Sequence, residues 1–300
     1  MTSTFKAIAI PHKFSLSSYL LKAHSRDQNG RSCTNCGTCF FVALDAQSTL
    51  LVTNWHMLTG CDPVTGQRST GWIGSPDTID IAVMRQEGET VPFASITTNL
   101  YDQGKPNWVE HKSRRKPGYD LAMIRLRKTL ELRVMELNLS DIQNGSRIVP
   151  GNECFVIGFP FGDSLEYPMS IWKRATIASG SMFDVKGEPR FLVDTATRPG
   201  MSGSPVFLSS RGLIMRRTRP TPTHELSKNE AALEQILSSE IVPSSDPQGE
   251  LIMDFCGVYQ GVFTDRIERD FQLGYVIEAQ ALTELISAPQ PGTNELPPAH

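Results

Sequence analysis

The sequence contains no apolar run that could span a membrane, and its charges are almost balanced. None of its 300 residues belongs to a stretch that approaches the roughly 18 apolar residues of a transmembrane helix. The formal net charge is −3, from 29 Lys and Arg against 32 Asp and Glu. This balance gives no reason to expect a nucleic acid or an anionic membrane as a partner.

The N-terminal region also lacks the apolar core of a secretory signal peptide. Its longest apolar run is Ala7-Ile8-Ala9-Ile10, which is shorter than the about 7–15 residues that such a core needs. A Pro-His-Lys stretch at residues 11–13 then breaks the run. We therefore expect a cytoplasmic protein whose residues 1–36 form an N-terminal extension.

Cysteines are few, and they do not complete a zinc ribbon. Cys33, Cys36, Cys39 and Cys61 could together bind zinc, but the second ligand pair of a ribbon is absent. We favour free thiols around the start of a strand, and we expect no metal and no cofactor. Two further cysteines lie in apolar strand-like runs and are predicted to be core thiols: Cys154 and Cys256.

What the chain does contain is a series of short strand patterns. Apolar, β-branched and aromatic runs alternate with Gly- and Pro-rich turns, which is typical of an all-β barrel or sandwich. Between the first and second halves of the pattern, residues 128–150 form the expected crossover. The predicted strands are 39–44, 49–53, 79–84, 120–126, 153–158, 171–178, 190–194, 205–208, 252–262 and 274–277.

Two long polar segments interrupt this pattern. The first, Asp102 to Lys116, carries a basic cluster that we expect to be a solvated surface loop. The second runs from Arg216 to Gly249, and loops of this length are often functional or disordered. Within it, Ser227 and Glu230 form a capping-box start for a predicted helix. Two interpretations stay open for this insertion: a loop that shapes access of a substrate or partner, or an uninvolved surface segment.

The C-terminal part predicts one helix followed by a tail. The apolar spacing of Ala281, Leu282, Leu285 and Ile286 indicates one buried helix face. Residues 289–300 are rich in Pro and polar residues, so we expect them to be disordered.

Three short motifs carry the candidate chemistry. Ser202 lies between glycines in Gly200-Met201-Ser202-Gly203-Ser204-Pro205, where backbone N–H groups can point into one cavity and stabilise an oxyanion. Serine is a weak nucleophile and needs a base. His56 ends an apolar run, and Asp120 opens another and could orient the histidine. The other five histidines are expected on the surface: His12, His24, His111, His224 and His300.

In these three motifs and in their order, the sequence resembles the trypsin-like serine peptidases. It is closer to the bacterial branch that includes the high-temperature-requirement proteases than to digestive trypsin. Leu51 to His56 resembles the histidine strand, Asp120 to Ile124 the aspartate strand, and Val193 to Pro205 the serine loop. The order His56, Asp120, Ser202 is that of the chymotrypsin-like group.

This resemblance implies two six-stranded antiparallel β-barrels with the active site in the cleft between them. We assign the first barrel to residues 37–130 and the second to 131–288, with the 216–249 insertion and a closing helix. Unlike in the high-temperature-requirement proteases, we expect no appended PDZ domain, because these 300 residues leave no room for one. A Cys39–Cys61 disulfide, as in secreted relatives, is a further reading that a cytosolic location disfavours.

The resemblance also implies a function, a serine endopeptidase that acts on protein or peptide substrates. His56, Asp120 and Ser202 would form the catalytic triad, and the N–H groups of Gly200 and Ser202 the oxyanion hole. The alternative is a catalytically silent protease fold that serves as a binding module.

At two positions, this sequence differs from the digestive members of the family that it resembles. The base of the primary substrate pocket would be formed by Ala196, with Gly261 nearby, where tryptic enzymes carry an aspartate. This predicts a preference for small or medium apolar side chains. Met201 occupies the position of the aspartate that pairs with a freed amino terminus in digestive zymogens, so we expect no N-terminal cut to be needed for activation.

Overall fold

The computed structural model describes most of the chain in two compact units, residues 1–208 with 254–300, and residues 209–253. No helix in the described part is long and apolar enough to cross a membrane. The described residues are 4–6, 13–84, 90–129, 134–143, 148–162, 169–181, 186–196, 198–210, 213–216, 240–243, 252–262, 272–296 and 298.

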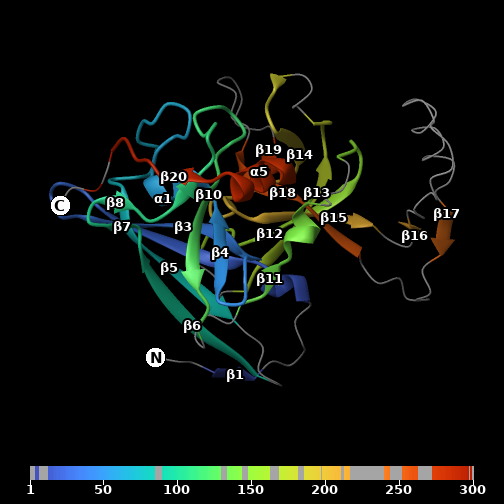
Figure 1. Ribbon diagram of the computed structural model, residues 1–300, viewed down its shortest axis with the longest axis horizontal. Coiled ribbons are helices and arrows are strands. Elements are labelled where there is room, and N and C mark those ends of the chain that lie inside the picture. Colours follow the sequence, from blue (N-terminus) through green and yellow to red (C-terminus); the bar gives the residue numbers. More distant parts are fainter. Residues whose placement is uncertain are drawn as a thin grey trace. The chain divides into compact units, whose positions relative to one another are not determined.

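The larger unit is mainly β-structure and begins with a ten-stranded sheet (Figure 1). Six of its strands are consecutive neighbours in the antiparallel order β6-β5-β2-β3-β4-β10, and β11 pairs in parallel with β3. In sheet order, the strands are β1 (Thr4–Lys6), β6 (Thr90–Asn99), β5 (Pro76–Met84), β2 (Tyr19–Arg26), β3 (Ser32–Ala43), β4 (Ser48–Thr53), β10 (Ala122–Arg127), β9 (Val109–Glu110) and β20 (Gln290–Pro291), with β11 (Glu136–Leu137) beside β3.

The second half of this unit is a closed six-stranded barrel, as predicted. Strands β12, β14 and β18 have the bounds expected from the sequence. Around the barrel, the strands are β12 (Glu153–Gly158), β13 (Ile171–Ile177), β14 (Arg190–Asp194), β19 (Leu273–Glu278), β18 (Ile252–Val262) and β15 (Pro205–Ser210).

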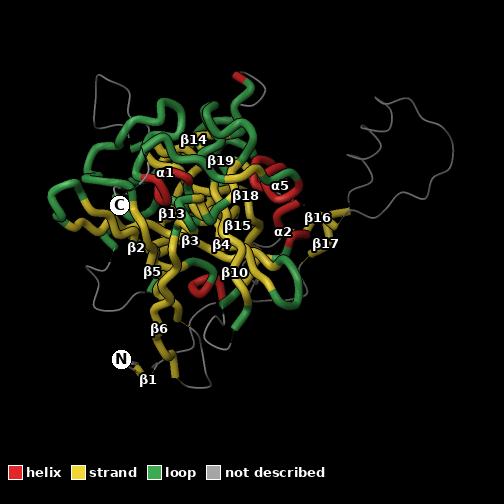
Figure 2. Tube along the Cα trace, turned by 60° about the vertical axis from the view of Figure 1, so that its left-hand side comes forward, coloured by secondary structure: helices red, strands yellow, loops and turns green. Residues whose placement is uncertain are grey.

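The described helices are short (Figure 2). The predicted C-terminal helix is α5 (Ala279–Ser287), which buries Ala281, Leu282 and Leu285. The others are the 3-10 helix η1 (Lys13–Leu16), α1 (Trp55–Thr59) and α2 (Leu139–Gln143). Two two-stranded sheets complete the described elements: β7 (Tyr101–Asp102) with β8 (Lys105–Pro106), and, in the smaller unit, β16 (Leu213–Arg216) with β17 (Glu240–Pro243).

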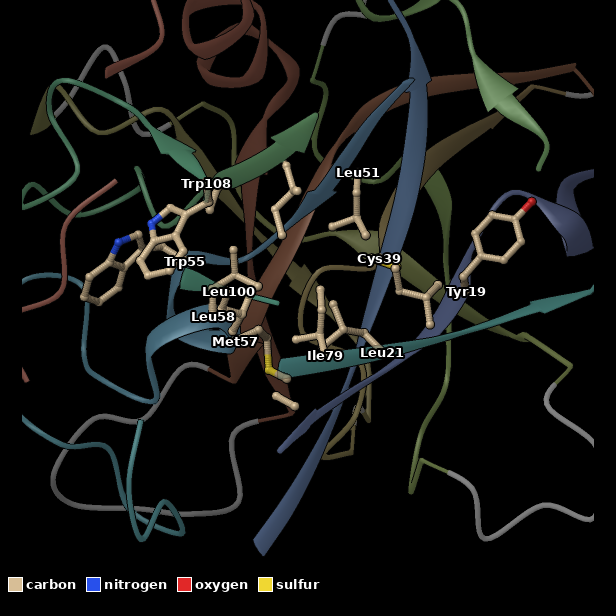
Figure 3. Packing of buried hydrophobic residues seen from close by; sticks show 14 of the residues in the cluster. Tyr19, Leu21, Cys39, Leu51, Trp55, Met57, Leu58, Ile79, Leu100 and Trp108 are labelled. Carbon is tan, nitrogen blue, oxygen red and sulfur yellow. The ribbon is translucent and has the colours of Figure 1, made fainter. Parts of the chain in front are cut away.

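Each half of the larger unit has its own apolar core. The first sheet encloses a cluster that includes Trp55, Leu58 and Trp108, three side chains that lie close together (Figure 3). The barrel encloses a second cluster that contains Met201 from the candidate serine loop. The two-barrel class of fold is therefore correct, although the first sheet has ten strands and no closing pair among those described.

The expected N-terminal extension over residues 1–36 is wrong in its second part. Strand β2 pairs with β3 along its whole length and with β5 on its other side. Its burial alternates, with Leu21 and Ala23 in the core. His24, which follows Ala23, has a polar partner across the sheet, since its Nε2 lies 2.9 Å from Asp80 Oδ2 of strand β5. The first sheet therefore begins before residue 37.

The expected disordered tail is also wrong where the structure describes it. Strand β20 pairs with β9, and Gly292 N donates to the carbonyl oxygen of Trp108 at 2.9 Å. A Pro-rich segment needs no helix or long strand when backbone and side-chain partners elsewhere satisfy its polar groups.

Two side chains expected on the surface are buried in the loop before Asp120. His111 is 2% exposed, stacks on Tyr119 and accepts a hydrogen bond from Ser113 N. Arg114 is 3% exposed. Its charge is compensated by carboxylates, which is the condition for burying a guanidinium group.

The remaining expectations concern cysteines and the insertion. All six cysteines are free, and Cys39 and Cys61 lie in the core of the first sheet without a disulfide. Cys154 and Cys256 are core thiols, as predicted. No cluster among the described residues could hold a metal ion. The helix predicted around Ser227 lies outside the described residues.

Candidate active site

His56 is the second residue of α1, which follows the fully buried strand β4. The helix is short because Gly60 ends it in the left-handed conformation, with φ of 69°. Asn54, just before the helix, donates from Nδ2 to the Asp120 carbonyl oxygen at 2.8 Å. This contact joins the two segments that carry the predicted base and its orienting acid.

Asp120 holds His56 through both carboxylate oxygens. Oδ2 lies 2.6 Å from His56 Nδ1, and Oδ1 accepts the His56 backbone N–H at 3.0 Å. Because an ionised carboxylate only accepts, Nδ1 carries the proton and Nε2 is left to accept one. The Asp120 side chain is 1% exposed and that of His56 is 19% exposed. The histidine can therefore act as a base at Nε2.

The electrostatics of this pair favour a basic imidazole. Burial lowers the pKa of His56, but the negative charge of Asp120 and its hydrogen bond outweigh burial and raise the pKa from its usual value. A histidine whose pKa is raised by a paired carboxylate is a suitable general base.

Ser202 lies in the turn between β14 and β15, next to glycines that the turn requires. Gly200 has φ of 100° and Gly203 has φ of 85°, which glycine adopts without strain. A Cβ on Gly203 would lie 2.1 Å from the Thr38 carbonyl oxygen, and one on Gly200 would lie 2.2 Å from the Phe159 carbonyl oxygen. The turn is therefore packed directly against β3 and the segment after β12.

The Ser202 hydroxyl is turned toward strand β18. Its Oγ donates to the Gln260 carbonyl oxygen at 3.2 Å. Among the contacts of the described residues there is no hydrogen bond between Ser202 Oγ and His56. The structure thus pairs His56 with Asp120 as predicted, while the third contact of the predicted triad is not made in this conformation.

A further feature is the backbone around Ser202, where the N–H groups of Gly200 and Ser202 are predicted to form an oxyanion hole. Phe161 N donates to the Pro199 carbonyl oxygen at 2.8 Å. Because a trans peptide points its N–H opposite to its carbonyl, this bond directs the Gly200 N–H away from Phe161. Neither the Gly200 nor the Ser202 N–H donates to another described residue, so both can donate to a developing oxyanion.

The two predicted pocket residues lie at the ends of segments that flank the site. Ala196 is exposed after β14, and Gly261 lies on β18 beside a β-bulge. Thr197 and residues 263–271, which adjoin them, lie outside the described part of the chain. The assignment of both residues to a substrate pocket stays a prediction.

Three residues that contact the site were not predicted: Thr38, Gln260 and Asn54. Thr38 N donates to the Ser202 carbonyl oxygen at 2.8 Å, and Thr38 Oγ1 donates to the Gly200 carbonyl oxygen at 2.8 Å. Gln260 contributes only a backbone oxygen to Ser202, so its side chain gave no signal. Asn54 was visible in the histidine motif, and its place before a short helix is the one signal that could have identified it.

The comparison with families defines the class of the protein. A family model described as a trypsin-like peptidase domain matches residues 37–214. This match covers more than half of the chain, so the chain belongs to the trypsin-like peptidase family.

Serine proteases are also found among solved structures with a similar fold. The HtrA-type protease AlgW, with a tripeptide, is 14% identical with a TM-score of 0.47, over 91% of this chain and 60% of that chain. The thermostable serine protease AL20 from an extremophilic microorganism is 11% identical with a TM-score of 0.47, over 92% and 98%. An inactive form of Rv3671c from M. tuberculosis H37Rv is 14% identical with a TM-score of 0.41, over 91% and 86%. No curated protein matched the chain.

Proposed function

We propose that the chain is a serine endopeptidase that hydrolyses peptide bonds through His56, Asp120 and Ser202. The observation that carries this proposal is the Asp120 carboxylate, which holds both the ring and the backbone of His56. A base oriented by an acid, with a serine on a glycine-rich turn, is the arrangement that acyl transfer requires.

The first half of the reaction forms an acyl-enzyme. The Ser202 hydroxyl leaves the Gln260 carbonyl oxygen and turns to His56, whose Nε2 takes its proton as Oγ attacks the substrate carbonyl carbon. The carbonyl oxygen becomes an oxyanion that accepts from the Gly200 and Ser202 N–H groups. The carbon–nitrogen bond then breaks, and the amine leaves with the proton from His56.

The second half returns the free enzyme. Water attacks the ester carbon while His56 takes one of its protons, and the Ser202–acyl bond breaks as His56 returns that proton to Oγ. Asp120 stabilises the imidazolium in both halves and does not itself become protonated.

A second candidate, a binding module without activity, is favoured by one observation. The Ser202 hydroxyl donates to Gln260 and not to His56, so the conformation described is not the attacking one. The two functions differ in whether the serine can react at all.

A fluorophosphonate probe tests the proposal. The full-length protein is expected to be labelled at Ser202, and Ser202→Ala is expected to lose peptide hydrolysis by roughly a million-fold with its fold intact. Ser204→Ala is the matched control in the same turn, because its buried hydroxyl has no partner among the described residues. Unchanged hydrolysis by pure, folded Ser202→Ala would contradict the assignment. A folded wild-type protein that is never labelled would support the binding module.

Specificity is a finer proposal. Ala196 offers no charge at the pocket base, so we expect cleavage after small or medium apolar residues. A peptide library digested by the wild-type protein and by Ser202→Ala measures this, and a profile dominated by Lys or Arg would refute it.

A further inference from the structure

The chain after α5 returns to the part of the molecule that carries His56 (Figure 1). Gln290 and Pro291 pair with Glu110 and Val109 of strand β9. Strand β9 in turn pairs with β10, which begins two residues after Asp120. We call residues 288–296 the C-terminal strap. It is attached to the strand next to the candidate base and acid, although it lies far away in the sequence.

Glu110 is the point at which the strap enters the interior. Its side chain is only 8% exposed. Its carboxylate accepts from Trp55 Nε1 at 2.8 Å, from Arg114 Nε at 3.1 Å, and from both the backbone N and Oγ1 of Thr293, each at 2.8 Å. A carboxylate has about four acceptor sites, so Glu110 is fully satisfied, and the strap supplies half of its donors.

Trp55 carries this contact to the candidate active site. It is fully buried as the first residue of α1, directly before His56. Its indole N–H is held by Glu110, and its ring faces the Arg114 guanidinium at 4.2 Å. Figure 3 shows this indole beside that of Trp108, whose carbonyl oxygen accepts from the strap at Gly292. The orientation of Trp55 is thus set on both sides by groups that the strap contacts.

Arg114 connects Glu110 with two further residues of the strap. Its Nη2 donates to Glu295 at 2.6 Å and to Thr293 Oγ1 at 3.1 Å, and its Nη1 donates to the Pro63 carbonyl oxygen at 2.7 Å. Pro63 lies in the loop that follows α1. The strap is therefore linked through Glu110 to the first residue of α1, and through Arg114 to the loop that follows α1.

We propose that Glu110 is a positioning residue which, fixed by the C-terminal strap, holds the start of α1 so that His56 meets Asp120. The inference rests on the proposed function, because it concerns how His56 comes to serve Ser202. Its physical basis is the short path from Glu110 through one indole to the backbone N–H that donates to Asp120 Oδ1. A displacement of about 1 Å at such a group can cost as much as 100-fold in rate.

The test uses full-length variants at Thr293. Thr293→Val keeps the shape but removes the hydroxyl that bonds Glu110 and Arg114, while Thr293→Ser keeps the hydroxyl. We expect Thr293→Val to slow fluorophosphonate labelling of Ser202 by about tenfold and to move the NMR titration midpoint of the His56 imidazole to lower pH. Thr293→Ser should behave like the wild type. Leu296→Ala, at an exposed strap side chain, is the control.

A second variant keeps the proposal falsifiable. Trp55→Phe removes the indole donor to Glu110 but retains an aromatic ring against Arg114. If both changes act through Glu110, the double variant is less impaired than the product of the two single effects predicts. Fully multiplicative effects, or a folded Thr293→Val protein with wild-type labelling and titration, would overturn the proposal.

The two proposals fail in different ways. If the wild-type protein is never labelled, the peptidase function fails, but the His56 titrations of the same variants still test the coupling. If labelling is normal and no variant moves the His56 midpoint, only the positioning role fails.

Discussion

At the scale of single residues, one carboxylate contacts two different parts of the same histidine. Asp120 binds both the Nδ1 and the backbone N of His56. The backbone contact fixes the position of the His56 main chain, and the side-chain contact fixes the rotation of the imidazole ring. Removing the charge of Asp120 should therefore alter both the tautomer and the basicity of the imidazole.

Asp120→Asn should change the pH dependence of the reaction. Catalysis needs a neutral imidazole, so the rate rises as pH passes upward through the His56 pKa, which Asp120 raises. The acidic limb of the wild type should lie above the about 6.5 of an ordinary histidine. In Asp120→Asn it should move to lower pH, and the plateau should fall by about 10⁴ because an amide favours the wrong tautomer. Labelling rates measured across neutral pH check this.

The exposed Asp194→Asn serves as the control for lost negative charge. The pH dependence of folding stability has its own sign, because the pKa of His56 is raised in the folded state. The resulting stabilisation is fully present below the unfolded pKa of about 6.5, and it is lost as pH rises through the folded-state pKa. A limb that stays in place in Asp120→Asn would show that Asp120 does not set the basicity of His56.

At the scale of elements, the sequence predicted those strands whose signal is local. Strands β12, β14 and β18 are apolar runs between turn residues and were predicted with their correct bounds. Strand β2 was missed as a full strand because its polar half, with Lys22 and His24, is indistinguishable from a solvated segment until β5 provides Asp80 as a partner.

The candidate site likewise has parts that local sequence motifs predicted and parts that only long-range contacts define. His56, Asp120 and Ser202 lie in recognisable motifs, and the structure brings the first two together. The contacts of Glu110 with Thr293 join residues 183 positions apart. No periodicity or composition of either segment carries that information, so a Pro-rich strap was interpreted as disordered.

The turn that carries Ser202 should be sensitive to a side chain at Gly203. Gly203→Ala should lower stability by about 1–3 kcal/mol from the left-handed backbone alone, and by more because its Cβ would lie 2.1 Å from the Thr38 carbonyl oxygen. Ser202 labelling should fall with it. Denaturant midpoints measure the change.

Gly180→Ala is the matched control, since a Cβ there meets nothing within 4 Å. If Gly203→Ala unfolds at the same denaturant concentration as the control, the turn is not held against β3 as described.

At the scale of the larger unit, Thr38 of strand β3 in the first sheet is hydrogen-bonded directly to the turn that carries Ser202. The N-terminal part is also attached to the barrel. Phe14 packs on Phe207 with ring centroids 4.9 Å apart, and Trp172 Nε1 donates to Ser15 Oγ. Met201, where a zymogen would need an aspartate, is fully buried in the apolar core of the barrel.

These contacts give a prediction about activation. An amine carried to buried Met201 would be an unpaired charge in an apolar core, so the uncut chain should react with the active-site probe. Intact mass of the labelled protein checks this. Because β2 begins at Tyr19, a truncated comparison should start at Lys13, so that the whole of β2 is kept. Labelling restricted to a shortened chain would contradict the prediction.

The contact of the strap with Glu110 also has a consequence for how the protein is made. A chain leaves the ribosome from its N-terminal end, and its early domains begin to fold during synthesis. His56, Asp120 and Ser202 have all been synthesised before residue 293 is added. If Glu110 sets the place of His56, the nascent chain carries all three residues in an unfinished arrangement. The proposed hydrolytic activity then appears only after residue 293 has been added, which protects the emerging chain from cutting itself or its neighbours.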